Sequence, residues 1–438
     1  MAEPGSISEE VVQFTSDLIR FDTSNYGSGN CTERPAAEYV AETLGAAGIE
    51  AQILESAPGR ANVVARVPGT HRDRDGLLVH GHLDVVPAQA SDWQVHPFSG
   101  EVREGMVWGR GAIDMKGMVA MMLTVARAWA RQGRRPRRDV VFAFTADEED
   151  SAAAGSDWLV RAHPNLFEGC TEGISESGGY TFHTTDGTRI YPVGAGERGT
   201  AWLDLSASGT AGHGSRTTTD NAVGALAAAV ARIDAHHWPV HLTPTVRAGL
   251  EALAGALGIP AAAQELTGQP GLARLGAARA LVEHTLRNST NPTMLSAGDK
   301  VNVIPAAASA RVDGRVLPGT EEEFERVLDE LTGPAVQWSY HHRSPALSAP
   351  VDGPMFGAIS AALRAHDPQA QVVPVCLSGG TDAKQFSQLG ITGYGFAPLR
   401  LPPDLHYQSL FHGVDERVPV DGLTFGAQVL DHFLSTVD

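Results

Sequence analysis

Long hydrophobic runs and cysteines are scarce in this sequence of 438 residues, and both shortages exclude classes of protein. No apolar run approaches the roughly 18 to 20 residues that a membrane helix requires, so we expect no membrane partner. The three cysteines, Cys31, Cys170 and Cys376, lie far apart and form no Cys-x-x-Cys pair. This spacing suits free thiols in a reducing cytoplasm better than a disulfide framework.

Basic residues are also few, since 33 lysines and arginines face 51 aspartates and glutamates, for a formal charge of -18. Nucleic-acid binding depends largely on Lys and Arg that displace counterions from phosphates, so we expect no nucleic-acid partner. The one basic cluster, at residues 134–138, is too short to reverse this balance and is interpreted as a solvated turn before a strand. The N-terminal residues carry no basic region, so we expect no targeting signal there.

The length predicts two domains, because a single hydrophobic core seldom grows to this size. In the first half, helical spacing at residues 11–19 and 37–44 alternates with short apolar runs at 77–79 and 140–145. This alternation predicts an α/β sheet covered by helices. Four apolar residues recur at helical spacing between the two runs, and we interpret them as core packing: Met118, Met122, Val125 and Trp129.

A second, smaller domain is expected at residues 198–346, inserted between two parts of the first domain, 1–197 and 347–438. Residues 243–290 are rich in Ala and Leu and broken by Gly and Pro, which predicts short extra helices within the smaller domain. The other patterns are a strand with Leu203, Leu205 and Ala207 on one face, a helix with Val223, Leu226, Val230 and Ile233 in phase, a strand at 308–316 and a helix at 321–331.

Polar residues suited to chemistry follow the two predicted strands of the first half. The run at residues 77–79 leads into His80, His82 and Asp84. A neutral imidazole is a good zinc ligand, and a carboxylate two residues on can orient it by accepting the other ring N–H. A hydrogen-bonded histidine that closes a strand explains His82 equally well. Strand ends are nevertheless where α/β proteins place their sites.

Acidic residues stand at two further segment ends. Asp114 follows a Gly-Arg-Gly stretch just before the Met-rich helix, where it can meet a metal or serve as the N-cap of the helix. Residues 147–150 are four consecutive acids after an apolar strand. A cation among them would relieve their repulsion, and a solvated acidic loop is the alternative. Together with Glu176 and His412, these segments supply a mixture of histidines and carboxylates suited to zinc or a similar divalent metal.

In this order, the motifs resemble those of the co-catalytic di-zinc metallopeptidases. That family includes acetylornithine deacetylase, succinyl-diaminopimelate desuccinylase, glutamate carboxypeptidase, carnosine dipeptidases, aminoacylase and carboxypeptidase S. The resemblance extends over residues 11–433. It implies a zinc-peptidase-like catalytic domain, with a mixed central sheet flanked by helices, and an inserted α+β domain that acts as lid and dimer interface.

The same resemblance assigns roles to residues of the catalytic domain. It implies two zinc ions per subunit, for which cobalt or manganese can substitute, with Asp114 as the bridging ligand. Glu148 is the implied general base and Asp84 the partner that orients a ligand. The implied metal ligands are His82, Asp114, Glu149, Glu176 and His412. Ser177 stands where a glycine is frequent in the family, which puts the local backbone path in question.

The smaller domain and a late loop carry the remaining implied roles. His213, in an Ala-Gly-His-Gly-Ser stretch, resembles the histidine that reaches into the neighbouring subunit of a dimer and helps stabilise an oxyanion. Asn302 and Arg315 resemble lid residues that contact the substrate, although strand-end hydrogen bonds would also explain them. The loop with Gly379, Gly380 and Thr381 resembles one that grips the substrate carboxylate, and a helix N-terminal cap is the alternative.

We therefore expect a cytoplasmic, homodimeric zinc hydrolase that cleaves an amide bond beside a free carboxylate in a small peptide or N-acyl amino acid. A biosynthetic deacylase, such as a desuccinylase or an acetylornithine deacetylase, would use the same metals. A catalytically silent binding protein is the alternative outside enzymes, but such proteins typically lose a ligand or the base.

Overall fold

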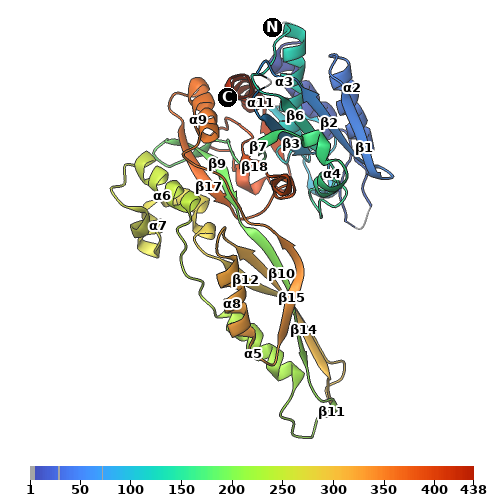
Figure 1. The fold of residues 1–438 in the computed structure, drawn as a ribbon, viewed down its shortest axis with the longest axis vertical. Helices are drawn as coiled ribbons and strands as arrows, with labels where there is room; N and C mark the ends of the chain where they lie inside the picture. The colour runs from blue at the N-terminus through green and yellow to red at the C-terminus, as the bar shows by residue number, and fades with distance from the viewer. Residues whose placement is uncertain (1–4, 28–29, 72) are drawn as a thin grey trace.

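The computed structural model describes residues 5–27, 30–71 and 73–438. Residues 1–4, which belong to the segment expected to lack a targeting signal, lie outside this part. A large mixed sheet forms the centre of the upper half of the molecule (Figure 1). Its strands, in spatial order, are β1 Ala51–Ala57, β2 Arg60–Val67, β6 Val140–Thr145, β3 Gly76–His82, β7 Cys170–Ser175, β18 Thr392–Gly395, β9 Arg189–Glu197 and β16 Leu347–Ser348, with β17 Gln371–Leu377 and β8 Phe182–His183 also paired to β9.

Strands β3, β6 and β7 are parallel and lie side by side at the middle of this sheet. Every residue of β3 and β6 is buried, as expected for parallel strands that are covered on both faces. Their carboxyl ends therefore meet at one edge, where the polar residues that follow them come together. This central sheet confirms the α/β class expected from the alternating pattern.

Helices cover both faces of the sheet. On one face α1 Ile7–Ile19, α3 Lys116–Gln132 and α11 Val420–Thr436 pack against one another, and α9 Pro354–His366 packs on α11. All four members of the predicted apolar stripe of α3 are buried in this core. The other elements of this part are α2 Arg34–Gly45 on the same face, α4 Ser156–Ala162 and α10 Ala383–Phe386 on the opposite face, and a small sheet of β4 Glu101–Arg103, β5 Met106–Trp108 and β19 Arg417–Pro419.

The smaller, four-stranded sheet lies in the lower half of Figure 1 with two helices packed on one face. Its strands, in spatial order, are β12 Ser289–Ala297, β14 Ala307–Val316, β10 Gly199–Ser208 and β15 Gln337–Ser344, and the helices are α5 Ala222–Asp234 and α8 Glu321–Thr332. The predicted inner face of β10 is buried. In α5, Leu226 and Ile233 are buried as expected and Val230 is partly buried, but Val223 is 38% exposed, so it lies outside the core that buries the neighbouring Ala222.

The helical segment 243–290 packs elsewhere than the sequence indicated. It contains α6 Pro244–Ala256, α7 Gln269–Arg274 and short 3-10 turns. Its apolar side chains form a separate core with Ile190 of β9 and with Val373 and Val375 of β17. This segment therefore covers one end of the large sheet and is not part of the smaller domain's core. Sequence position between two lid elements gave no information about which sheet the helices would cover.

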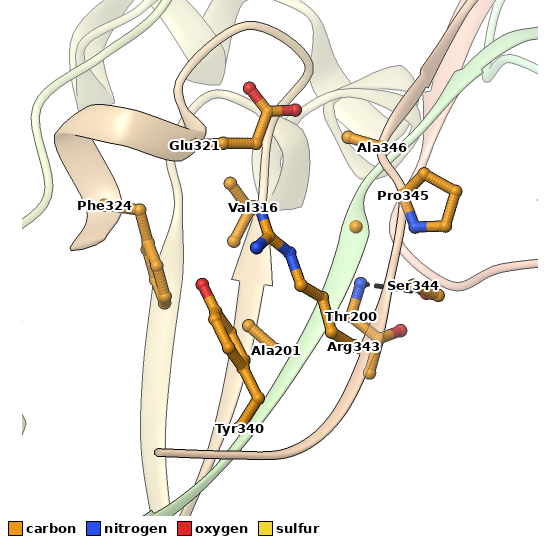
Figure 2. Close-up of a pocket in the computed structure, with 11 residues that line it drawn as sticks. Thr200, Ala201, Val316, Glu321, Phe324, Tyr340, Arg343, Ser344, Pro345 and Ala346 are labelled. Carbon is orange, nitrogen blue, oxygen red and sulfur yellow. Dashed lines mark hydrogen bonds between the residues drawn. The ribbon is translucent and has the colours of Figure 1, made fainter. Parts of the chain in front are cut away.

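The two halves join where β9 continues into β10 and β15 returns to β16. A cavity of about 340 Å³ lies at this junction, between strands β10, β14 and β15 and the start of α8. Figure 2 shows its lining, in which the backbone N–H of Thr200 donates to the hydroxyl of Ser344. Arg343 lies over the ring of Tyr340 and pairs with Glu325. None of the predicted metal ligands lines this cavity.

Three expectations from the sequence can be compared with the structure. The three cysteines are free thiols, as predicted. Among the described residues, no helix combines the length and apolar character needed to cross a membrane. The basic cluster at 134–138 forms the turn between α3 and β6, where Arg134 pairs with Asp431 and Arg138 pairs with Glu172.

Candidate metal centre

His82 is the last residue of β3 and is 1% exposed. Its Nδ1 lies 2.9 Å from the backbone carbonyl oxygen of Asp84, and 3.6 Å from the Asp84 carboxylate. The carbonyl therefore orients the ring, which corrects the expectation that the carboxylate does so. The Asp84 carboxylate instead accepts the backbone N–H groups of Glu148 and Glu149, at 3.1 and 3.2 Å.

Asp114 lies at the end of a glycine-containing loop that a buried carboxylate holds in place. Glu416 is fully buried and accepts the backbone N–H groups of Gly111, Ile113 and Asp114, at 2.7 to 3.1 Å. The guanidinium of Arg110 also donates to Glu416 at 2.7 Å. Because α3 begins at Lys116 and its N-cap is Met115, Asp114 does not cap the helix. Its carboxylate is thus available for the site.

The four acidic residues after β6 lie in different surroundings. Asp147 adopts a left-handed backbone conformation, with φ of 65°, and this turns the chain sharply at the strand end. Its side chain is buried and pairs with Arg60. Glu148 and Glu149 follow with their carboxylates on the site side, and Asp150 is exposed. The run is therefore not a solvated acidic loop.

Glu176 follows the last residue of β7 and is 9% exposed. The next residue, Ser177, has φ of 68°, in the left-handed region that favours glycine. The chain thus follows the path that a glycine would take, although serine occupies the position. His412 lies on the other side of the site, before β19, and its side chain is 56% exposed, so the site opens to solvent there.

The structure brings the five predicted ligands together in two groups that share one residue, Asp114. In the first group, His82 Nε2 lies 3.1 Å from Asp114 Oδ1 and 3.9 Å from Glu176 Oε2. In the second, His412 Nε2 lies 3.3 Å from Asp114 Oδ2 and 3.1 Å from Glu149 Oε2. The two oxygens of Asp114 thus face different groups, as a bridging carboxylate requires.

The electrostatics of these groups favour bound cations. Burial, with the neighbouring Glu176 carboxylate, raises the pKa of Glu148 well above its usual range. Burial and Asp114 raise the pKa of Glu176 in the same way. Hydrogen bonds to Asp114 and Glu149 raise the pKa of His412 to about 10. Negative charge is therefore in excess in a buried space, and divalent cations would compensate it.

The donor set also fits two divalent metal ions. Each group offers one imidazole nitrogen and carboxylate oxygens, a combination that zinc accepts. Among the described residues, Glu149 Oε1 is a buried oxygen without a hydrogen-bond partner, so a lone pair remains for a ligand. The carboxylate of Glu148 belongs to neither group, although Glu176 and Glu149 lie near enough to influence its pKa.

An aromatic groove runs beside the site. Tyr180 and Tyr407 pack together with ring centroids 4.5 Å apart, and the Gln408 amide donates to the Tyr180 hydroxyl. Two hollows, of about 540 and 120 Å³, share Tyr180 and Gln408. Ser177, next to Glu176, lines the smaller hollow. The outer wall comes from the helical segment 243–290, through Ala277, Ala280, Leu281 and His284.

In the loop expected to grip a substrate carboxylate, Thr381 is already bonded to another part of the chain. The N–H and hydroxyl of Thr381 both donate to the buried carboxylate of Glu197, at 3.1 and 2.7 Å. The Thr381 hydroxyl also accepts the N–H of Ala383, the first residue of α10, although the N-cap of this helix is Asp382 and not Thr381. Gly379 and Gly380 are exposed. Of the three loop residues, only the two glycines are exposed enough to meet a substrate carboxylate.

The predicted lid residues lie in two different parts of the smaller domain. Arg315 is on β14, where it donates to Asp313 and to Thr200. His213 and Asn302 are exposed and lie in paired segments, β11 Gly212–His213 and β13 Val303–Ile304 with its preceding turn. Figure 1 shows β11 at the lower tip of the molecule, opposite the end that holds β3 and β7.

A comparison with protein families decides the identity of this arrangement. The family model described as Peptidase family M20/M25/M40 matches residues 78–436. The chain belongs to this peptidase family. The M20 match confirms the resemblance drawn from the ordered motifs, and the chain is a hydrolytic enzyme of the family.

This M20 chain has low sequence identity to its individual relatives, but the alignments cover most of both proteins. It is 25% identical over 463 residues to the N-fatty-acyl-amino acid synthase/hydrolase PM20D1 of Xenopus tropicalis, covering 98% of this chain and 86% of the relative. It is 26% identical over 421 residues to aminoacylase-1 of Mus musculus, covering 93% and 92%. The crystal structure of an M20 family metallo-carboxypeptidase from Sulfolobus solfataricus matches with a TM-score of 0.69 at 18% identity, covering 98% of each chain.

Sequence reasoning missed several residues that hold this M20 site together. Glu416 supports the Asp114 loop, and Asp382 accepts the hydroxyls of Thr145 and Ser156 behind the strand ends. Arg60 pairs with both Glu33 and Asp147. The only signal for Glu416 was its place four residues after His412. Arg60 and Glu33 carried no signal, because a lone charged residue is usually solvated.

Proposed function

We propose that this protein is a zinc-dependent amidohydrolase, with two zinc ions per subunit, that cleaves an amide bond beside a free carboxylate. The observation that carries the proposal is the pair of ligand groups that share Asp114, with the free carboxylate of Glu148 beside them. Zinc suits the imidazole and carboxylate donors, and cobalt or manganese can replace it.

The residues of the chain divide the chemistry among them. Bound divalent metal ions supply Lewis acidity, which polarises the scissile carbonyl and lowers the pKa of water. Glu148 accepts a proton from the attacking water as its oxygen bonds to the carbonyl carbon. As the carbon–nitrogen bond breaks, Glu148 delivers that proton to the leaving nitrogen.

We propose a homodimer in which His213 of the second subunit completes the site. His213 lies at the tip of the smaller domain and is exposed, so it would meet a set of metal ligands only in another molecule or after a large domain movement. Strand β12 is an edge strand, with Met294 and Leu295 59% and 63% exposed. Exposed apolar edge strands tend to pair with another chain. In that position His213 would stabilise the developing oxyanion.

The substrate is proposed to be an N-acyl amino acid or small peptide with an apolar group. The exposed Gly379 and Gly380 supply backbone N–H donors for the carboxylate, and Asn302 or Arg315 of a lid contributes further donors. The groove beside Tyr180 and Tyr407 accepts the apolar group. The named activities of PM20D1 and aminoacylase-1 support this substrate class. A biosynthetic deacylase for a small polar acyl group is the alternative.

Hydrolysis of a matched substrate panel tests the proposal. The same amino acid carrying acetyl, succinyl, octanoyl and aromatic acyl groups is compared with dipeptides and with the corresponding amino-acid amides. We expect apolar acyl groups to give the highest kcat/KM, and loss of the free carboxylate to lower it. A chelator should abolish turnover, and added zinc, cobalt or manganese should restore it. Preference for succinyl or acetyl substrates would favour the deacylase, and turnover unaffected by chelation would reject the metal mechanism.

Complementation between two inactive variants tests the shared site. Glu148→Gln and His213→Ala subunits are mixed, dissociated and reassociated, and activity is compared with each variant alone. If His213 acts in the other subunit, one of the two sites of a mixed dimer has both residues intact. Activity should therefore recover to about one quarter of the wild-type value, since about half of the dimers formed at random are mixed. Mixtures that stay as inactive as the parents would show that His213 does not act across subunits.

A further inference from the structure

A chain of buried polar contacts supports the turn that carries Glu148 and Glu149. The Asp84 carboxylate, which accepts the N–H groups of both glutamates, also accepts the side-chain amide of Asn25 at 2.9 Å. The same amide donates to Asp147 at 3.0 Å. Asn25 thus connects the residue that begins the turn with the residue that holds its N–H groups.

Arg60 continues this chain of contacts on the other side of Asp147. Its Nη2 donates to Asp147 at 2.7 Å and to Glu33 at 2.9 Å, and its Nε donates to Glu33 at 2.9 Å. Arg60 is 6% exposed and Glu33 is fully buried. The hydrogen bonds from Arg60 and Asn25 lower the pKa of Asp147 despite its burial. The pairing is therefore a desolvated ion network and not a surface salt bridge.

The network counteracts a conformation that the turn would not adopt alone. A residue other than glycine in the left-handed region costs free energy, and such strain persists only where the surroundings impose it. Asp147 is held by Arg60, by Asn25, and by the hydroxyl of Ser151 and the N–H of Ala154. A shift of Asp147 would move Glu148 and Glu149 directly, because they follow it in the chain.

We propose that Arg60, fixed by Glu33, and Asn25 are positioning residues for Glu148 and Glu149. This inference rests on the proposed function, in which Glu148 is the base and Glu149 a metal ligand. Arg60, Glu33 and Asn25 all precede residue 78, where the match to the family model begins. These three residues of the N-terminal part therefore support the site and do not only cover the sheet.

The test compares Arg60→Lys with Arg34→Gln. Lysine keeps the charge but loses the fork that reaches Glu33 and Asp147 together. Arg34 lies in the same part of the chain, and its ion pairs with Glu38 and Glu55 are exposed, so its loss should change nothing at the site. We expect Arg60→Lys to lower kcat about 10- to 100-fold with KM nearly unchanged, and to weaken metal binding by a similar factor. The visible spectrum of the cobalt-substituted protein should also change.

A second positioning variant, Asn25→Ala, and a reference variant, Glu148→Gln, separate failure of this inference from failure of the proposed function. Asn25→Ala removes the bridging amide but leaves the ion pair of Arg60 with Asp147 in place. It therefore reports on positioning if Arg60→Lys fails to fold. Normal kcat, metal affinity and cobalt spectrum in the folded variants, even with a lower Tm, would overturn the inference and leave a purely structural network. Glu148→Gln serves as the reference: if it remains active, the proposed function fails first, whatever the Arg60 and Asn25 variants show.

Discussion

Glu148→Gln is expected to lower kcat by about 10²- to 10⁴-fold, the usual contribution of a general base, while the metal content stays unchanged. The carboxylate belongs to neither ligand group, so its conversion to an amide removes proton acceptance without removing a ligand. The amide also keeps the size of the side chain, so the turn that Asp84 holds through the Glu148 N–H should persist. The measurement is kcat and KM alongside elemental analysis of the purified protein.

Asp150→Asn provides the matched control for this experiment. Asp150 is two residues away in the same acidic run, but it is exposed and lies outside both ligand groups. Its substitution should leave kcat within about twofold of wild type, since exposed residues away from special features seldom contribute much. If Glu148→Gln retained activity with its metals in place, another group would have to take the proton. A variant that lost its metals would instead place Glu148 among the ligands.

The parts of this site that could be anticipated follow from local sequence patterns. The strand predicted at residues 140–145 is β6 Val140–Thr145, because a buried parallel strand is a continuous apolar run with a clear end. Parallel strands then place whatever follows them at one edge, and this brings His82 and Glu149 to the same edge, each in a group with Asp114. The position of these side chains was thus encoded close to them in sequence. Their metal-binding role remains a proposal.

The contacts that escaped prediction join residues far apart in sequence. Thr381 donates to Glu197, and helix α6 covers β17. No local sequence pattern specifies either contact. The hydrogen-bond partner of the His82 ring was predicted incorrectly for a different reason. A carbonyl and a carboxylate of the same residue, Asp84, can both reach an imidazole, and only the geometry of the turn decides between them. Second contacts of this kind set the direction of a catalytic side chain and leave few marks in one sequence.

The shared ligand predicts a difference between two metal-site variants. Asp114→Ala removes an oxygen from both groups, whereas His412→Ala removes a nitrogen from one. We expect Asp114→Ala to bind less than one metal ion per subunit, and His412→Ala to keep about one, in the group of His82, Asp114 and Glu176. Both should lose more activity than the roughly 10- to 100-fold typical when a residue that only orients a ligand is removed. Elemental analysis and metal titration measure the difference.

Two exposed residues serve as controls for this pair, Asp92→Asn and His71→Ala, because neither lies in a ligand group. Their metal content should equal that of the wild type. Equal metal loss in Asp114→Ala and His412→Ala would contradict independent filling of the two groups and would mean that neither group binds without the other. Retention of two ions in Asp114→Ala would remove Asp114 as the bridge. The difference between the variants therefore tests how one carboxylate couples two metal sites, which the loss of activity alone would not resolve.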